Sequence, residues 1–83
     1  MNILYFASIR EKIGRGEETV SPPVDISNVG ELIDWLRQRG PDYERALGDP
    51  RTVRVAVNQE HAKLDHPVGA DDEVALFPPV TGG

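Results

Sequence analysis

The most distinctive reactive group in this chain is the carboxylate at its C-terminal end. The sequence closes with Pro78-Pro79-Val80-Thr81-Gly82-Gly83. Glycine has no side chain, so the last two residues present the thinnest backbone that a protein can offer. Two adjacent prolines hold the start of the run extended, and six residues at about 3.3 Å each span roughly 20 Å. The pattern predicts a flexible tail over residues 78–83 whose working group is the carboxylate of Gly83.

The chemistry open to this group follows from its reactivity. A carboxylate is a poor electrophile, so we expect a separate ATP-using enzyme to activate Gly83 as an acyl-adenylate, after which a sulfur donor displaces AMP. The product is a thiocarboxylate, whose soft, ionised sulfur is readily delivered to an electrophilic carbon. A side chain at position 82 or 83 would widen the C-terminal segment that a partner's active site must accommodate. The tail predicts a carrier that other proteins load and unload; an ordinary fraying terminus is the alternative.

Few side chains elsewhere suit catalysis or metal binding. The chain has no Cys, which excludes disulfides, thiolate metal sites and cysteine nucleophiles. The two histidines, His61 and His66, are expected on different elements, and the acids between residues 65 and 73 fall in predicted turns. Gly14-Arg15-Gly16 lacks the further glycines, the Lys and the following helix of a phosphate-binding loop. We expect no metal, no bound cofactor and no catalytic site within this chain.

Length and charge bound the classes of protein to which this chain can belong. Its 83 residues suffice for one domain, expected over residues 1–77 ahead of the tail. The net charge of −5 would repel a phosphate backbone, so no nucleic-acid partner is expected; the charge suits a basic protein surface or simply keeps the domain in solution. No signal peptide and no apolar stretch of membrane-spanning length is visible, and we expect a cytoplasmic protein without a membrane partner.

The elements that must position the tail form an α+β pattern. Strands are expected at residues 2–7, 17–21, 52–58, 61–64 and 73–77, with a main helix at 29–39 and short helical turns at 8–13 and 43–47. In the first strand both alternating sets are apolar, which predicts a central strand covered on both faces, one of them by a partner protein. Hairpins grouped around one helix favour α+β over alternating βαβ units.

The main helix is the clearest of these elements. Its apolar residues recur at the spacing of one helical face: Val29, Leu32, Ile33 and Leu36. Asn28 is the expected N-cap, with Glu31 three residues later, and Gly40-Pro41 is expected to stop the helix. Trp35, at the edge of the stripe, is assigned to packing.

Several blocks of residues together carry a resemblance to a known family. They are Leu4-Tyr5-Phe6-Ala7, Ile9-Arg10-Glu11, Ala56-Val57-Asn58-Gln59, Asp65-His66-Pro67, Asp72-Glu73-Val74-Ala75 and the ending Phe77-Pro78-Pro79-Val80-Thr81-Gly82-Gly83. The whole chain resembles the small subunit of molybdopterin synthase, the MoaD-type sulfur carrier with a ubiquitin-like β-grasp fold. The resemblance implies a mixed sheet of four to five strands packed on one main helix.

The resemblance also implies partners and site residues. Gly83, after Gly82, would be adenylated by a MoeB-type adenylyltransferase that uses ATP, converted to a thiocarboxylate and inserted into the large, MoaE-type subunit. There it would supply sulfur to cyclic pyranopterin monophosphate in molybdenum cofactor biosynthesis, within a heterotetramer of two small and two large subunits. By the same resemblance the contact with both partners involves Phe6, Arg10, Phe77, Pro78, Val80 and Thr81.

Other functions share the same tail. A sulfur carrier for thiamin, the tungsten cofactor or tRNA thiolation, a ubiquitin-like modifier of lysines and a β-grasp binding module with an inert tail stay open. Two departures from the family pattern are visible: His61 stands where relatives often have an aliphatic contact residue, and Gly30 replaces a better helix former, at about 1 kcal/mol relative to Ala.

Overall fold

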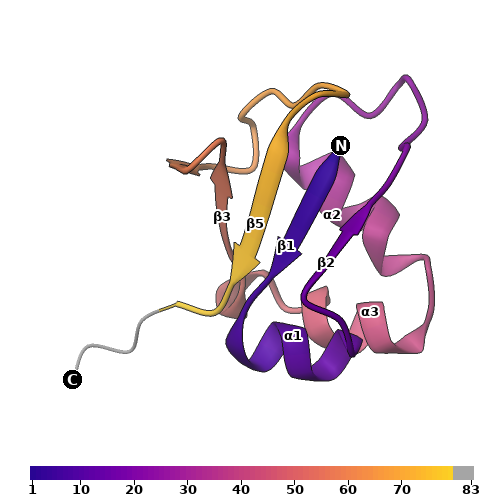
Figure 1. The fold of residues 1–83 in the computed structure, drawn as a ribbon, viewed down its shortest axis with the longest axis vertical. Helices are drawn as coiled ribbons and strands as arrows, with labels where there is room; N and C mark the ends of the chain where they lie inside the picture. Colours follow the sequence, from indigo (N-terminus) through magenta and orange to yellow (C-terminus); the bar gives the residue numbers. More distant parts are fainter. Residues whose placement is uncertain (80–83) are drawn as a thin grey trace.

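The first and last strands of the chain lie side by side at the centre of one mixed sheet. β1 (Asn2–Tyr5) pairs in parallel with β5 (Glu73–Phe77), as Figure 1 shows. This computed structural model describes residues 1–79. Residues 80–83, and with them most of the predicted tail, lie outside the described residues.

The remaining elements surround this central pair. In chain order they are α1 (Ala7–Ile13), β2 (Glu17–Thr19), α2 (Val29–Arg37), α3 (Pro41–Leu47), the 3₁₀ turn η1 (Pro50–Thr52), β3 (Arg54–Val57) and β4 (Glu60–Ala62). The strand order is β2-β1-β5-β3-β4, and every neighbouring pair except β1 and β5 is antiparallel. The predicted α+β class and central first strand are confirmed.

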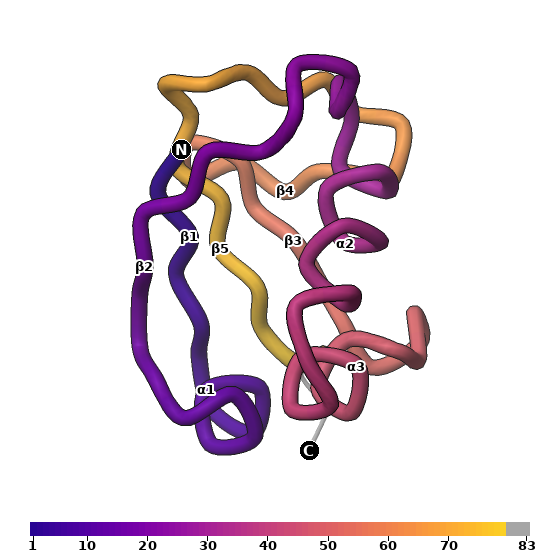
Figure 2. Tube along the Cα trace, turned by 90° about the vertical axis from the view of Figure 1, so that its right-hand side faces the viewer, coloured from indigo at the N-terminus to yellow at the C-terminus, as the bar shows by residue number. Residues whose placement is uncertain are grey.

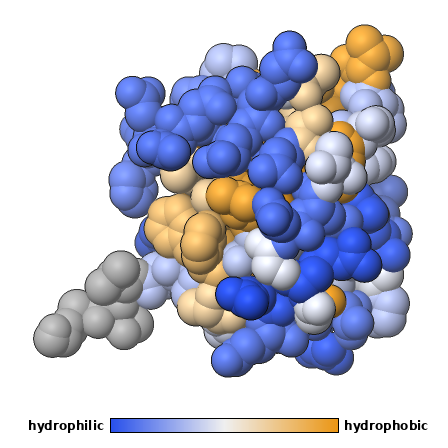
Figure 3. Space-filling view, viewed as in Figure 1, coloured by the Kyte–Doolittle hydropathy of each residue, from blue (hydrophilic) through white to orange (hydrophobic). Residues whose placement is uncertain are grey.

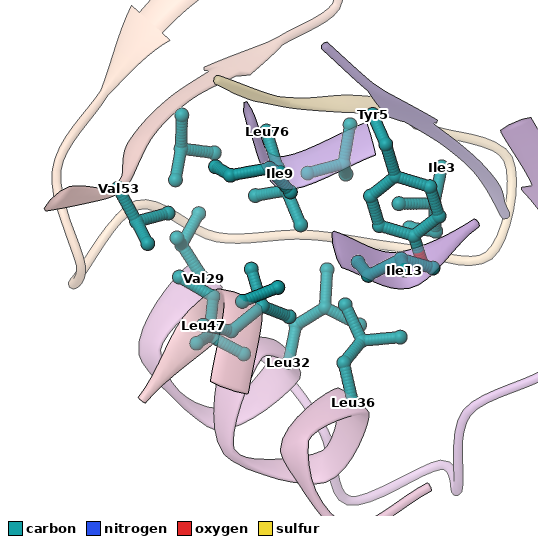
Figure 4. Close-up of a cluster of buried hydrophobic side chains, with 14 of the residues drawn as sticks. Ile3, Tyr5, Ile9, Ile13, Val29, Leu32, Leu36, Leu47, Val53 and Leu76 are labelled. Carbon is teal, nitrogen blue, oxygen red and sulfur yellow. The ribbon is translucent and has the colours of Figure 1, made fainter. Parts of the chain in front are cut away.

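One face of the sheet packs against the helices. Alternate residues of the three middle strands are buried on that face: Ile3, Tyr5, Val55, Val57, Val74 and Leu76. α2 buries its predicted stripe against them, and Figure 2 shows α2 and α3 standing to one side of the strands. Figure 4 shows side chains from both layers meeting in this core. Trp35 packs against the core from its edge, in agreement with the structural role assigned to it.

The start of α2 agrees with the prediction and its end does not. The Asn28 side chain accepts a hydrogen bond from the Glu31 backbone N–H at 2.8 Å, and the Glu31 carboxylate accepts one from the Ser27 N–H at 2.8 Å. The helix stops at Arg37 instead of residue 39. Gly40-Pro41 does not end α2 but begins α3, because a proline in the first helical turn needs no N–H partner.

Four predicted strands are shorter or shifted, and the first of them, expected at 2–7, ends at Tyr5 because α1 begins at Ala7. The strand expected at 17–21 ends at Thr19, and the strand expected at 52–58 is confined to Arg54–Val57 because residues 50–52 form η1. β4 begins at Glu60 instead of residue 61, since Asn58 and Gln59 make the predicted turn with positive φ values of 51° and 71°, as a two-residue hairpin turn requires.

The short helices also differ slightly from their predicted bounds. α1 begins one residue earlier than expected, at Ala7, and ends as predicted at Gly14, whose φ of 90° suits glycine and whose N–H donates to the Arg10 carbonyl at 2.8 Å. α3 begins two residues earlier than the expected 43–47. None of the helices in residues 1–79 has the length and apolar character needed to cross a membrane.

Candidate functional site

The sheet face opposite the helices carries an apolar band across its middle. Leu4, Ala75 and Ala56 occupy one row, because the strand register pairs Leu4 with Ala75 and Ala75 with Ala56. All three are partly exposed, whereas their neighbours along each strand are buried. Figure 3 shows apolar side chains gathered over this part of the molecule between hydrophilic areas. We call Leu4, Phe6, Ala56, Ala75 and Phe77 the outer-face patch.

Phe77 sits at the end of β5, where the described chain leaves the sheet. It is half-buried, and its ring meets the His61 ring edge-on, with centroids 5.7 Å apart. Across the ladder it pairs with Arg54 of β3. Pro78 and Pro79 follow and are also half-buried. Phe77 therefore marks the point from which the terminal residues depart.

Phe6 lies at the same end of the sheet. Its backbone N–H donates to the Leu76 carbonyl at 3.1 Å, so Phe6 sits beside the end of β5. Its side chain is 47% exposed, which is high for a large aromatic group. The structure thus brings Phe6, Phe77 and Pro78 together at the base of the predicted tail.

Arg10 is not part of this group. It is exposed on α1, and its guanidinium lies against Gly16, 3.3 Å from where a Cβ at that position would be. Gly16 borders β2, on the other side of β1 from β5. Arg10 therefore leans toward the β2 edge, whereas the Phe77 ring leans toward β4.

The four remaining predicted site residues fall in the segment that is not described. Val80, Thr81, Gly82 and Gly83 lie outside the described residues. Their assignments to the partner contact and to the reactive carboxylate stay predictions.

Sequence reasoning missed the anchor that joins the β2 edge of the sheet to α3. The Glu18 carboxylate, 6% exposed, accepts hydrogen bonds of 2.7 Å from both the Tyr5 and the Tyr43 hydroxyl and lies 3.0 Å from Arg39. Burial opposes ionisation of Glu18, but the hydrogen bonds from Tyr43 and Tyr5 and the charge of Arg39 outweigh it and lower its pKa. Burial, followed by the hydrogen bond to Glu18, raises the pKa of Tyr5.

The Arg39 guanidinium of this anchor also lies against two aromatic rings. Its guanidinium lies 5.4 Å from the Trp35 ring centre and 5.3 Å from that of Tyr43. The only hint of this in the sequence is a glutamate within a strand, since the partners come from elements far apart in the chain. Both oxygens of the Glu18 carboxylate are bound within the protein, so we assign the anchor a structural role.

The remaining polar clusters are also structural. Asp72 accepts hydrogen bonds from the Asn58 side chain at 2.9 Å and from the Gly69 N–H at 2.8 Å, and these bonds lower its pKa. In the part of the chain that the structure describes, no three His, Asp or Glu side chains are grouped as metal ligands would be.

The Gly14-Arg15-Gly16 turn borders a wide, shallow hollow, and Arg15 pairs with Glu18 at 3.3 Å.

Comparison with known proteins assigns this arrangement to a family. A family profile described as the ThiS family matches residues 3–83. The chain belongs to the ThiS family.

Full-length relatives of this ThiS-family chain support the same assignment. It is 37% identical to the molybdopterin synthase sulfur carrier subunit of Escherichia coli (strain K12), covering 100% of this chain and 99% of that protein. The protein of that name from Mycobacterium tuberculosis (strain ATCC 25618 / H37Rv) is 40% identical, with 100% and 96% covered. The resemblance drawn from the sequence blocks is confirmed.

A solved structure confirms the fold. The crystal structure of Haloferax volcanii small archaeal modifier protein 1 superposes with a TM-score of 0.79 at 34% identity, covering 96% of this chain and 97% of that one. The ThiS-family chain therefore has the ubiquitin-like β-grasp fold predicted from its resemblance.

Proposed function

We propose that this chain is the sulfur-carrier subunit of a molybdopterin synthase. The observation that carries the proposal is the full-length similarity, at 37% and 40% identity, to two proteins of that name. The exposed aromatic side chain of Phe6 beside Phe77, at the base of the terminal segment, supports it. A carrier needs such a surface because its partner must hold the domain while it handles the tail.

In this proposal the chemistry takes place at Gly83 and is supplied by partners. A MoeB-type adenylyltransferase joins the Gly83 carboxylate to AMP, with pyrophosphate leaving from ATP. A sulfur donor then displaces AMP and leaves a thiocarboxylate. The thiocarboxylate sulfur bonds to a carbon of cyclic pyranopterin monophosphate inside the large subunit, and water hydrolyses the resulting thioester, which leaves the sulfur on the pterin and recovers the Gly83 carboxylate. This chain contributes no catalytic side chain and binds no cofactor itself.

The outer-face patch is the surface we assign to these partners. Phe6 and Phe77 of the patch supply the apolar centre that a protein interface requires, and Pro78, Val80 and Thr81 continue the contact along the tail. Arg10 is placed at the rim of the contact, because its side chain lies toward the other edge of the sheet. The complete enzyme is proposed as a cytoplasmic heterotetramer of two small and two large subunits.

Mass spectrometry of the intact chain tests the carrier function. After incubation with ATP, a MoeB-type enzyme and a sulfur source, the chain should gain about 16 Da, the difference between sulfur and oxygen. Adding the large subunit and the pterin substrate should return the original mass. A chain that never changes mass would favour a binding module with an inert tail.

A second candidate is a ubiquitin-like protein modifier. It is favoured by the similarity to small archaeal modifier protein 1 of Haloferax volcanii. A modifier would be recovered from its own cell in isopeptide bonds between Gly83 and lysines of other proteins. A carrier would be recovered free or as a thiocarboxylate.

A further inference from the structure

The β3–β4 hairpin opens at one end and leaves a hollow there. β4 pairs only with Val55–Val57, after which the chain turns toward α2, where the Leu64 carbonyl accepts from the Gly30 N–H at 2.8 Å. The separation leaves a hollow of about 330 Å³ whose apolar floor includes Pro50, Val53 and Leu64. Leu64 is 56% exposed. The same three residues border a second hollow of about 200 Å³ beside α2, so the two form one groove.

The charged side chains around the first hollow are all basic. Arg54 and Lys63 line it together with His61, and no carboxylate does. Within residues 1–79, neither Arg54 nor Lys63 forms a salt bridge, whereas Arg37 of the second hollow is paired with Asp34 and Glu44. Glu60 and Asp65, the acidic residues on either side of residues 61–64, do not line the hollow. Four Lys and Arg side chains in residues 1–79 form no salt bridge, and two of them, Arg54 and Lys63, line this one hollow.

The backbone beside this groove is the free edge of the sheet. β4 is the outermost strand on its side. In a two-residue hairpin the closing pair, here Val57 and Glu60, exchanges hydrogen bonds, so the next pair, Ala56 and His61, does not. The His61 N–H and C=O therefore point outward. They can pair with an added strand.

We propose that this edge binds an extended, acidic segment of another protein. The segment would add to β4 as a strand, seat one apolar side chain over Val53 and Leu64, and place carboxylates beside Arg54 and Lys63. A second copy of this chain fits poorly, because pairing β4 with β4 would bring two sets of these cations together. The inference does not use the tail, although the edge adjoins the outer-face patch: Arg54 pairs with Phe77 across the ladder, and the His61 ring meets the Phe77 ring.

A capped six-residue peptide of alternating valine and glutamate, titrated into the full chain, tests the proposal. We expect amide NMR shifts centred on residues 60–64 and a Kd of the order of 10⁻⁴ M, typical of a short added strand. The matching peptide of valine and lysine should bind at least about tenfold more weakly. Equal binding of both peptides, equal shifts with inorganic phosphate alone, or shifts centred on Phe77 would overturn the proposal.

Variants separate the contribution of the basic side chains to peptide binding from that of the backbone hydrogen bonds of β4. Arg54→Glu with Lys63→Glu should weaken binding of the glutamate peptide at least about tenfold. Lys12→Glu, which reverses the charge of one exposed lysine on α1, should leave its Kd unchanged and is the control for the single variant Lys63→Glu. His61→Pro removes an outward N–H without breaking the β3 ladder and should also abolish binding. Unchanged amide shifts in β5 show that each variant is folded. A chain that dimerises through β4 at millimolar concentration would refute the acidic-segment assignment.

Discussion

At the scale of single residues, Glu18 is the side chain on which the sheet edge most depends. Glu18→Gln keeps the size of the side chain but removes the charge that faces Arg39 and weakens both tyrosine hydrogen bonds. We expect the free energy of unfolding to fall by about 1–3 kcal/mol, measured by urea denaturation. Glu17→Gln is the matched control, since Glu17 is exposed on the same strand, and it should change stability by less than about 0.5 kcal/mol. Equal effects of the two variants would contradict the role of Glu18.

The same cluster predicts how stability depends on pH. The pKa of Glu18 is lowered from 4.5, so its contribution is present above pH 4.5 and is lost as the pH falls through the lowered value. The pKa values of Tyr5 and Tyr43 are raised from 10.0, so their contribution is present below pH 10.0 and is lost as the pH rises beyond it.

Unfolding free energies measured from pH 2 to 11 should therefore decline at both ends. Tyr5→Phe should make the alkaline decline shallower without removing it, because the residue at position 5 can no longer ionise on unfolding while Tyr43 still can. Glu18→Gln should make the acid decline shallower without removing it, since the pKa values of Asp49 and Asp72 are lowered as well. An alkaline decline as steep in Tyr5→Phe as in the parent chain would contradict this account.

Phe77 is the residue whose role in the proposed interface is most directly testable. Phe77→Ala should weaken binding of the large subunit by at least about tenfold, as expected for a central interface aromatic, while lowering stability by only about 1 kcal/mol because the ring is half-buried. Titration calorimetry beside thermal melts separates the two effects. Val24→Ala, a fully exposed apolar residue of the loop between β2 and α2, is the control. Unchanged affinity in Phe77→Ala would remove Phe77 from the interface.

The role of a residue could be predicted from the sequence only where it depends on neighbours a few positions away in the chain. The capping pair Asn28 and Glu31 is three residues apart, so spacing alone predicts it. Arg10 and Phe77 are separated because the Arg10 side chain lies toward β2, on one side of β1, and the Phe77 ring lies toward β4, on the other side. Spacing along the chain does not predict this. The outer-face row of Leu4, Ala56 and Ala75 depends on strand register, which a sequence does not state.

At the scale of elements, two glycines near helix ends should respond to substitution in opposite ways. A Cβ on Gly30 in the first turn of α2 would approach the Leu64 carbonyl only to 3.4 Å, which is ordinary contact. Gly30→Ala should therefore stabilise the protein by about 0.4–1 kcal/mol, through helix propensity and a less flexible unfolded chain. A Cβ on Gly48 would lie 2.6 Å from the Glu44 carbonyl, so Gly48→Ala should destabilise it.

Thermal melts of the two variants measure this contrast. For a domain of this size, 1 kcal/mol corresponds to about 4–8 °C in Tm. Two shifts of the same sign would show that space around the Cβ does not decide the outcome.

The types of the helices and strands were predicted correctly, whereas η1 and several boundaries were not, for a common reason. Where the apolar stripe or alternation decides, as in α2 and β5, the element forms as expected. Where a proline or glycine decides, the sequence permits two interpretations. Gly40-Pro41 can end one helix or begin the next, and tertiary packing of α3 against α1 and α2 selects the second.

At the scale of the whole molecule, the domain and its terminal segment are predicted to act independently. Deleting Gly83, or adding one residue after it, should abolish formation of the thiocarboxylate while leaving Tm within about 1 °C, because no residue of the described core is altered. Mass spectrometry and thermal melts measure the two effects. The unaltered chain is the control in both assays. Full sulfur loading of either variant would remove Gly83 from its proposed role.

The central position of the last strand also bears on how the protein is made. Val74 and Leu76 of β5 are fully buried between β1 and β3, so the sheet cannot close while the nascent chain still lacks its fifth strand. Chains released early by the ribosome would leave the core open and be exposed to proteolysis. The domain can therefore fold only after β5, the strand that precedes the C-terminal segment, has been synthesised.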